Sequence, residues 1–554
     1  MNDTLSIIPL GGAGDVTKNM YVYEYKDEIF IVDCGLGFAD ETMLGVDLLL
    51  PDVSYILDQV SKGKRIVGMA ISHGHEDHMG ALPYLLPQLP EGFPIYASPL
   101  TAAMANNKLT EYTLGNRITP VEFDAPEQQV GSFSLSFIRV THSVPDTAHI
   151  FIKTPVGNIY HGSDFKFDRT PYDGKETEFE KIKSLSSQGV LCLLSDCLGV
   201  EREGVNKSES ELTPHFREAL RTCSGKLVVT TYSSNIARIN QVLDIAKEFN
   251  RKVCFVGKSL IKTKDVAQKL GYIKIPQGFE VEIEELKRYK DSEMVLIVAG
   301  TQGQGNSALS RIANSEHREI SLNAEDLVIF SSDPIPGNEV AVYGVIDQLA
   351  KQEVAALYSP ATRDFHVSGH GAAGELGELI DLVKPQFMLP IGGSFRHMFG
   401  YRKMAMKKGY GKEKILLWED GHEVILSPGQ ARFGRTIPVK AVYVDEVGDE
   451  VEQFVLRDRQ KLSEGGIVII MAEVDSNTGQ LVAPPDVIMR GFPAPADKRL
   501  VSKINSEISK TLGFRRGRVV NWVHIRKTVG EVAEKAIFRT LRRRPLVLPV
   551  VLEV

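Results

Sequence analysis

The 554-residue sequence has few cysteines and no long hydrophobic run. Its five cysteines are odd in number and form no Cys-x-x-Cys pair, so the sequence predicts neither a disulfide framework nor a thiolate zinc site. The longest apolar stretches, such as residues 467–472, are too short to span a bilayer, and residues 1–10 lack the basic start and apolar core of a secretory signal. We therefore expect a cytoplasmic protein that does not associate with membranes.

The sequence also lacks an excess of basic residues. Its formal net charge is −7 at pH 7, and charge alone disfavours binding to a nucleic acid. Arginines are nevertheless concentrated near the C-terminus, where they could contact phosphates or form a solvated surface. The chain is long: 554 residues are more than a single hydrophobic core usually accommodates, so we expect two to four domains.

Strand and helix patterns divide the chain. Strand-like segments open the sequence, whereas helices and strands alternate from about residue 209 to residue 349, which favours an α/β domain with a largely parallel sheet. Histidine-rich signals resume near residue 366, so this second domain is predicted to be inserted into the first. The expected order is a first domain at 1–205 and 355–430, an insertion at 206–354, a linker at 431–451 and a small C-terminal α/β domain at 452–554.

One segment, residues 73–78, carries a dense set of potential metal ligands: His73, His75, Asp77 and His78. Imidazole and carboxylate groups suit zinc or manganese, and such a crowded set is unfavourable without a cation among them. A purely structural loop is the alternative, but core histidines seldom cluster in this way. Because successive side chains of an extended loop point in different directions, one loop can supply two metal positions. Two cations about 3.5–4 Å apart suit phosphodiester hydrolysis.

These residues, together with Asp33, His142 and Asp164, resemble the successive metal motifs of the metallo-β-lactamase superfamily. The segments LLSDCLGVE (193–201), SSDPIPGNE (331–339), HVSGHG (366–371), VLRDRQKLSEGGIV (455–468) and RRRPLVLPVVLEV (542–554) are similar to ribonuclease J, a β-CASP nuclease family, over essentially the whole chain. The resemblance implies an α/β fold: a metallo-β-lactamase αββα sandwich with an inserted β-CASP α/β domain and a small C-terminal α/β domain.

The resemblance also implies roles for individual residues. One metal would be held by His73, His75, His142 and Asp164, and the other by Asp77, His78 and the bridging Asp164. The two divalent ions would be zinc, with manganese or magnesium as alternatives. The implied catalytic residues are Asp77, Asp196, which orients the site, and His370, which contacts the scissile phosphate and can protonate the leaving oxygen. The implied substrate-binding residues are Ser233, Ser234, Asn235, His366, Val367, Ser368, Gly369 and His370.

The activity implied by the family is endonucleolytic and 5′-to-3′ exonucleolytic cleavage of RNA, in RNA processing and decay, with a preference for a 5′-monophosphate end. The implied partners are RNA and further protein subunits. A homodimer or homotetramer would form through the C-terminal domain, and a hetero-oligomer with a paralogue is also possible within the family.

The sequence departs from the family pattern at one metal ligand. Gly392 stands where the family has its last histidine ligand, so the second metal site is expected to be weak or differently liganded. His397 lies five residues further on, but we favour a structural role for it. Asp333 and the loop at 301–311 also differ from the usual pattern, and an anion near a phosphate path is unfavourable.

Gly392 motivates a second hypothesis of another class. The chain could be a weakly active or inactive paralogue that binds RNA or stabilises a partner ribonuclease. We favour the active enzyme, because the other six ligand positions and His370 are all present, and a site that has lost its function has no physical reason to keep buried charges.

Overall fold

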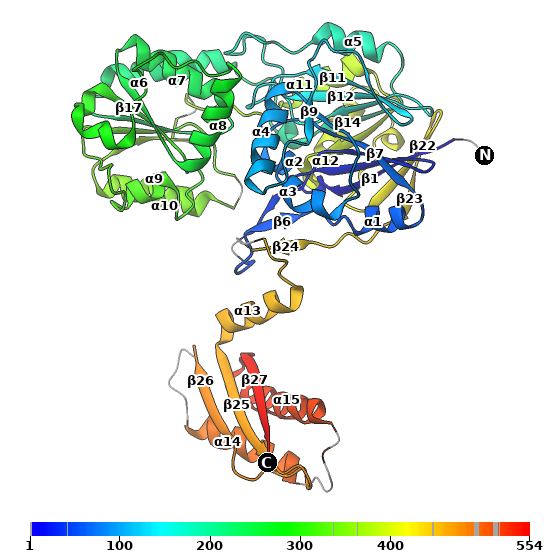
Figure 1. Ribbon diagram of the computed structural model, residues 1–554, viewed down its shortest axis with the longest axis vertical. Coiled ribbons are helices and arrows are strands. Elements are labelled where there is room, and N and C mark those ends of the chain that lie inside the picture. The colour runs from blue at the N-terminus through cyan, green and yellow to red at the C-terminus, as the bar shows by residue number, and fades with distance from the viewer. Residues whose placement is uncertain are drawn as a thin grey trace. The chain divides into compact units, whose positions relative to one another are not determined.

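The computed structural model describes residues 3–40, 42–335, 337–359, 361–362, 364–445, 448–491, 498–513, 519 and 521–554, with only the backbone of Lys498 (Figure 1). The chain divides into two compact units. The first unit consists of residues 1–38 and 49–442, and the second of residues 39–48 and 443–554. Among the described residues, no helix is long and apolar enough to cross a membrane.

Two sheets form the centre of the first unit, and their apolar side chains share one core that includes Tyr23, Phe30, Phe133 and Leu193. The larger sheet has the spatial order β23 (Gln430–Thr436), β22 (His422–Ser427), β1 (Leu5–Gly11), β3 (Met20–Tyr25), β4 (Glu28–Val32), β7 (Arg65–Ile71), β8 (Ile95–Ala97) and β9 (Ile118–Pro120). The smaller sheet has the order β10 (Gln128–Val130), β11 (Phe133–Arg139), β12 (Ala148–Lys153), β13 (Ile159–Gly162), β14 (Cys192–Asp196) and β20 (Phe387–Ile391).

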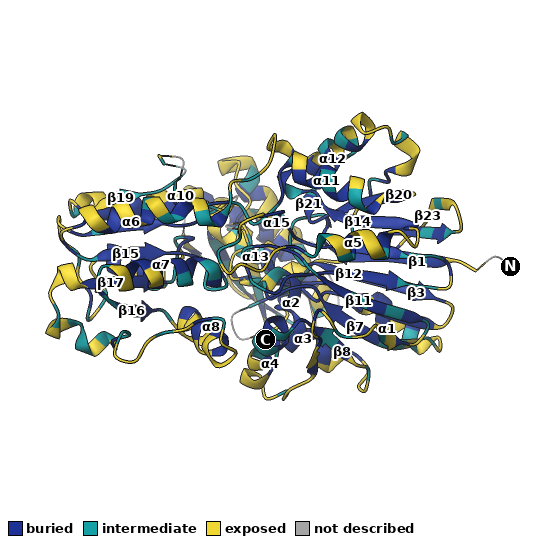
Figure 2. Ribbon diagram, turned by 90° about the horizontal axis from the view of Figure 1, so that it is seen from above, coloured by how far each residue is buried: buried dark blue, intermediate teal, exposed yellow. Residues whose placement is uncertain are grey.

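Helices lie on the outer faces of these two sheets, where they expose one side and bury the other (Figure 2). They are α1 (Ser54–Ser61), α2 (Glu76–Met79), α3 (Leu82–Leu85), α4 (Pro99–Glu111), α5 (Phe179–Ser186), α11 (Ala373–Val383) and α12 (Phe395–Lys407). Helix α4 contacts β8 and β9, whereas α11 contacts β14 and α12 contacts β20. The architecture of this part of the chain is therefore a four-layered αββα sandwich.

A separate parallel sheet lies between residues 227 and 357. Its spatial order is β16 (Lys252–Val256), β17 (Met294–Val298), β15 (Leu227–Thr230), β18 (Leu327–Phe330) and β19 (Ala355–Leu357). The helices between these strands are α6 (Thr213–Thr222), α7 (Ile236–Glu248), α8 (Lys258–Lys269), α9 (Ala308–Ala313) and α10 (Glu339–Lys351). A hydrophobic cluster covers each face of the sheet, as expected for parallel strands joined by helices.

The second unit contains a three-stranded sheet with helices. The spatial order is β26 (Asp486–Arg490), β25 (Ile467–Val474) and β27 (Leu546–Glu553), with β25 antiparallel to β26 and parallel to β27. Its helices are α13 (Gln453–Gly465), α14 (Lys498–Gly513) and α15 (Trp522–Leu541). Residues 514–518 and 520, in the arginine-rich stretch, lie outside the described residues.

Two boundaries in the structure differ from those expected. The segment expected to be a linker, 431–451, begins inside strand β23, which pairs with β22 across a turn at Gly429. The turn-rich sequence at 427–430 therefore joins two paired strands instead of ending the domain, because a hairpin turn and a linker have the same residue preferences. Residues 446 and 447 of that segment lie outside the described residues. The parallel sheet likewise extends to Leu357, three residues beyond the expected end of the insertion at 354.

Five further short strands are found among the described residues. They are β2 (Ala13–Gly14) and β21 (Gly393–Ser394), which pair in parallel, and β5 (Gly37–Phe38), β6 (Leu48–Leu50) and β24 (Val442–Val444).

Candidate metal centre

The predicted site residues follow strands of both sheets in the first unit. Strands β13, β14 and β20 are parallel, so their carboxyl ends lie at the same edge of the smaller sheet. From the ends of β13 and β14, the loops after β7 and β11 and the segment before α11, the structure brings together His73, His75, Asp77, His78, His142, Asp164, Asp196 and His370. They form three groups, and within each group the ligand atoms lie within 4.8 Å of one another.

The loop at 73–78 is held against the loop that follows β4. The backbone N–H of Cys34 donates to the carbonyl of His78, and that of Leu36 donates to the carbonyl of Glu76. Between them, a Cβ added to Gly35 would overlap the carbonyl oxygen of Asp77. Only glycine permits this approach, which places the metal-binding loop beside Asp33.

The first group consists of His73, His75, His142 and Asp164. The Nδ1 atom of His75 lies 3.0 Å from Nε2 of His73 and 3.1 Å from Nε2 of His142. Asp164 Oδ2 lies 3.8 Å from Nε2 of His73 and 3.9 Å from Nε2 of His142. Three ring nitrogens and one carboxylate therefore converge on one point.

The second group consists of Asp77, His78 and Asp164. His78 Nε2 lies 3.7 Å from Asp77 Oδ2 and 3.4 Å from Asp164 Oδ2. The other ring nitrogen, Nδ1, donates to Asp33 Oδ2 at 2.8 Å, and Asp33 also accepts hydrogen bonds from the backbone and hydroxyl of Ser72. Asp33 and Ser72 thus fix the orientation of the His78 ring.

The third group joins His370 to two carboxylates. His370 Nδ1 donates to Asp196 Oδ2 at 2.9 Å, and Nε2 lies 3.8 Å from Asp164 Oδ2. Asp164 is thus common to all three groups. Because the Nδ1–H of His370 is hydrogen-bonded to Asp196, the Nε2 atom on the opposite side of the ring faces the space between the groups.

Burial and neighbouring charges shift the pKa values of these histidines in opposite directions. Burial lowers the pKa of His73 and His142, and it lowers that of His75 to about 4. Burial opposes charge on His370 as well, but the carboxylates of Asp196 and Asp164 outweigh it and raise the pKa of His370 to about 9.

The pKa values of two carboxylates in the centre, Asp77 and Asp164, also shift in opposite directions. Burial raises the pKa of Asp77 to about 6. Burial opposes the charge of Asp164, yet the imidazoles of His78 and His370 outweigh it and hold the pKa of Asp164 below its usual range.

The hydrogen-bond partners show that this donor set fits divalent cations. His142 Nδ1 donates to the carbonyl oxygen of Gly369 at 2.6 Å, which leaves a lone pair on Nε2. His75 Nδ1 lies 3.1 Å from that atom and 3.0 Å from Nε2 of His73, so a cation at this point would be within reach of all three ring nitrogens. Imidazoles fixed by a carbonyl or carboxylate behind the ring are typical of metal ligands.

Gly392 faces the carboxylates of Asp164 and Asp196. A Cβ at this position would lie 3.6 Å from Asp164 Oδ1 and 3.8 Å from Asp196 Oδ1, which are ordinary contact distances. A side chain at 392 would thus point towards the metal ligands, although φ is +63° and favours glycine. His397 does not fill the gap. Its Nδ1 accepts from the backbone N–H of Ser394 and caps α12, in agreement with a structural role.

The predicted substrate-binding residues lie in two loops of the first unit. Asn235 is buried and accepts from the backbone N–H of Arg238, so it caps α7. Ser233 hydroxyl lies 3.1 Å from that of Ser259, whereas Ser368 accepts from Arg202. Gly369 contributes the carbonyl that orients His142. No contact of Ser234 or Val367 with the metal-binding groups is seen among the described residues, and Val367 is buried in the apolar cluster around Phe365.

Asp333 lies beside one of these loops. Its carboxylate is 3.9 Å from Nε2 of His366, and its backbone carbonyl accepts from the hydroxyl of Tyr232. The anion noted in the sequence therefore faces a residue that was expected to bind phosphate.

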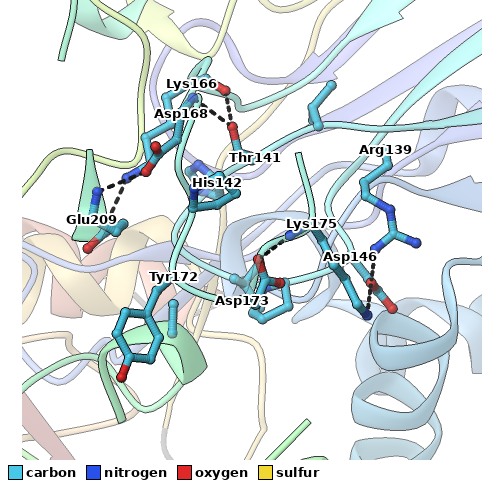
Figure 3. A pocket seen from close by; sticks show the side chains of 15 residues that line it. Arg139, Thr141, His142, Asp146, Lys166, Asp168, Tyr172, Asp173, Lys175 and Glu209 are labelled. Carbon is cyan, nitrogen blue, oxygen red and sulfur yellow. Dashed lines mark hydrogen bonds and ion pairs between the residues drawn. The ribbon is translucent and has the colours of Figure 1, made fainter. Parts of the chain in front are cut away.

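A small pocket lies behind His142, lined by charged residues (Figure 3). On one side, Arg139 Nη1 lies 3.0 Å from Asp146 Oδ1. On the other, Lys166 Nζ lies 2.6 Å from Glu209 Oε1. Arg238, which does not line the pocket, has its Nη2 atom 2.5 Å from Glu209 Oε2. We call Lys166, Glu209 and Arg238 the buried triad, because all three are nearly inaccessible to solvent. It joins the loop that carries Asp164 to α7.

Sequence reasoning missed several of these supporting residues. The role of the carbonyl of Gly369, a residue expected only to bind substrate, and that of the buried triad depend on contacts between segments distant in the chain, which no local pattern indicates. Ser72 did have a local signal, since a hydroxyl directly before His73 lies within reach of the metal ligands.

Comparisons with known proteins agree with this architecture. Family models match at residues 13–186 (metallo-beta-lactamase superfamily), 224–349 (ribonuclease J, beta-CASP domain) and 454–554 (ribonuclease J C-terminal domain). A solved protein of unknown function from Enterococcus faecalis covers 76% of this chain and is itself covered completely, with a TM-score of 0.53. At 16% identity this likeness concerns the fold alone.

Curated relatives are similar over most of the chain. Ribonuclease J 1 of Streptococcus pyogenes is 38% identical, covering 88% of this chain and 86% of its own. Ribonuclease J of Mycobacterium tuberculosis is 36% identical, covering 99% and 97%. Ribonuclease J2 of Bacillus subtilis is 32% identical, covering 100% and 99%. These matches confirm the resemblance, the fold class and the enzyme class expected from the sequence. The chain belongs to the ribonuclease J family of metal-dependent ribonucleases in the metallo-β-lactamase superfamily.

Proposed function

We propose that this chain cleaves RNA phosphodiester bonds at the centre around Asp164, both within the chain and from a 5′-monophosphorylated end, in RNA processing and decay. The observation that carries this proposal is the convergence of seven ligand and acid–base groups on one buried carboxylate, Asp164. We assign the first metal position to His73, His75, His142 and Asp164, and the second to Asp77, His78 and Asp164. Zinc suits these donors, with manganese or magnesium as alternatives.

Two divalent ions in these positions would supply positive charge for the phosphate oxygens and lower the pKa of water. The residues of the chain would then perform separate tasks. Asp33 and Gly369 orient His78 and His142 through hydrogen bonds. Asp196 holds His370 by its Nδ1 proton, so Nε2 is the atom placed to donate a proton to the departing 3′ oxygen. The products would carry 5′-phosphates.

The test uses full-length protein, a 5′-monophosphorylated RNA and a 5′-hydroxyl RNA of the same sequence, with manganese or zinc added. His78→Ala and Asp164→Ala should abolish cleavage, whereas His524→Ala, an exposed histidine in the second unit, should retain it. Labelling the RNA at either end separates internal cuts from progressive removal of 5′ nucleotides. Cleavage by Asp164→Ala at the wild-type rate would rule the proposal out.

A second candidate function is an RNA-binding or partner-stabilising protein with weak activity. The absence of a side chain at Gly392, beside Asp164, favours it. Metal content per chain separates the two candidates. Two tightly bound ions support the nuclease, whereas one or none, together with RNA binding but slow cleavage, supports the second candidate.

We also infer that the chain forms a homodimer or homotetramer, or a hetero-oligomer with a paralogue, through the C-terminal domain at 452–554. In support of this, Leu548 and Leu552 of β27 are each 48% exposed in the second unit. We propose that the sandwich and its insertion follow the expected limits of 1–205 with 355–430, and 206–354, except that β23 extends the sandwich to Thr436 and β19 extends the insertion to Leu357. Sedimentation of the full chain, compared with a Leu548→Ser/Leu552→Ser variant, tests the oligomer.

A further inference from the structure

Helix α12 has two contrasting faces. Its inner face, with His397, Met398, Tyr401 and Ala405, is buried against the sandwich. Its outer face exposes Phe395, Phe399 and Met406 by 49%, 42% and 45%. The helix lies at the surface of the unit (Figure 2). Two exposed aromatic rings four residues apart lie side by side on a helix, which is unusual for a face that contacts only water.

The segment that contains α12, residues 382–412, has a net positive charge, whereas the whole chain has a net negative charge. Residues 382–412 contain no aspartate or glutamate, whereas the complete chain has a net charge of −7. The segment holds seven basic residues: Lys384, Arg396, Arg402, Lys403, Lys407, Lys408 and Lys412. A concentration of one sign of charge creates a local potential that attracts polyanions even when the protein as a whole is acidic.

Part of this charge is not neutralised by the protein itself. Arg396 pairs with Glu201 at 3.2 Å, and Lys408 pairs with Asp381 at 2.6 Å. In contrast, Arg402, Lys403 and Lys407 form no ion pair with a carboxylate in the described part of the chain. Two of these cations lie instead over the ring of Phe399, at 5.5 Å for Arg402 and 4.5 Å for Lys403.

The helix begins close to the candidate metal centre. Gly392 faces Asp164, and Phe395 follows three residues later, a chain length of at most about 11 Å. The thirteen residues of α12 then extend for about 20 Å. The exposed rings and cations of α12 therefore begin within about 11 Å of chain from the residue that faces Asp164.

We propose that the outer face of α12 binds single-stranded RNA next to the cleavage site. Bases stack on Phe395 and Phe399, while Arg402, Lys403 and Lys407 contact phosphates. Alternating rings and cations fit a single strand, in which bases and phosphates are both accessible, because stacking tolerates any base and the cations follow the backbone. The inference deepens the proposed function and rests on it for the identity of the polymer. An apolar protein partner would leave the three cations unpaired.

The experiment measures binding of a labelled single-stranded RNA to full-length protein in a chelator, so that the RNA stays intact. Phe395→Ala/Phe399→Ala should weaken binding of a 20-nucleotide RNA by roughly tenfold or more. Arg402→Gln/Lys403→Gln should reduce the slope of log affinity against log salt by about 1.4, since each phosphate contact contributes about 0.7. The matched control is Phe433→Ala/Arg432→Gln, an equally exposed pair on β23, which should bind like wild type.

Unchanged RNA affinity and salt dependence in both α12 variants would overturn the inference. So would a change in sedimentation without a change in RNA affinity, since that result identifies a protein interface. Failure of the proposed function looks different: the wild type would bind RNA through α12 but would not cleave it with any added metal. If cleavage of a trinucleotide is retained in the α12 variants while the 20-nucleotide RNA binds weakly, both proposals stand.

Discussion

Two clusters of buried charge lie beside each other in the first unit, and both include the segment from Asp164 to Lys166. In the buried triad, one carboxylate lies between two cations, and every charge has an opposite partner within hydrogen-bond distance. In the metal centre, ring nitrogens of His73, His75 and His142 lie 3.0–3.1 Å apart, and no lysine or arginine of the described residues pairs with the central carboxylate, Asp164. In the first cluster the side chains compensate one another's charges, whereas the second cluster needs bound ions to bring its ligands together favourably.

The largest effect should come from Asp164, the carboxylate common to the three groups. Asp164→Asn preserves the shape of the side chain but removes its charge, so both metal positions lose a ligand. We expect RNA cleavage to fall on the order of 10⁴-fold. Cleavage rates with saturating manganese measure this, and metal content of the same preparation should fall below that of wild type. If the variant binds as much metal and cleaves RNA as fast as wild type, the centre does not require Asp164 to hold its ions, which would contradict the prediction.

Removing the anion of the buried triad should affect stability more than chemistry. Glu209→Gln leaves Lys166 and Arg238 buried without a counter-charge, at a cost of about 3–5 kcal/mol. Denaturant unfolding of the full chain measures it, with Glu218→Gln on the exposed face of α6 as a control.

The pH dependence of this effect has a definite sign. The cations beside Glu209, acting against burial, lower its pKa from 4.5 to about 2 in the folded chain. Its contribution to stability is therefore complete above pH 4.5 and is lost as the pH falls towards 2. The difference in unfolding free energy between wild type and Glu209→Gln should shrink across this range. A difference that is constant from pH 6 to pH 3 would show that the triad is not ionised as proposed.

A chelator should destabilise the metal centre without affecting the buried triad. Ions that bind only the folded chain stabilise it by about 2.7 kcal/mol at a concentration of 100 times Kd. We expect a chelator to lower the Tm of wild type by several degrees, and added manganese or zinc to restore it. Glu209→Gln should show the same shift from a lower starting Tm, because its defect does not involve the ions. If the chelator leaves the Tm unchanged, the centre does not depend on ions for its stability.

The smallest effect should come from adding the ligand that the second group lacks. In Gly392→His the left-handed backbone costs about 1–2 kcal/mol, but the new side chain points towards Asp164. We expect affinity for the second metal ion to rise roughly tenfold, a net gain near 1.4 kcal/mol. Metal titration of the chelator-treated protein measures it. Gly392→Ala has the same strain without an imidazole, so equal affinities in the two variants would contradict the prediction.

The sequence predicted the parts of this molecule whose signals are local. The six-residue run from His73 to His78 indicated a metal site, and segments such as HVSGHG at 366–371 identified the family, which the comparisons confirm. The roles assigned to individual site residues remain predictions, although the structure brings those residues together.

The rest could not be read from the sequence, for physical reasons. The sequence from Ser427 to Gln430 favours a turn, but only tertiary pairing decides whether a turn joins two strands or ends a domain. The buried triad joins residues 166, 209 and 238, and nothing in the neighbourhood of any one of them indicates the other two. Asn235 suits phosphate binding by its chemistry, yet its side chain also caps α7.

The buried triad has a mechanical consequence for the two halves of the first unit. Lys166 belongs to the sandwich and Arg238 to a helix of the parallel-sheet domain, and Glu209 joins them where solvent does not enter. Separating such a pair exposes buried charge, whereas rotating about it does not. A movement that pulled the sandwich and the parallel-sheet domain apart at Glu209 would therefore cost more free energy than one that kept the triad intact.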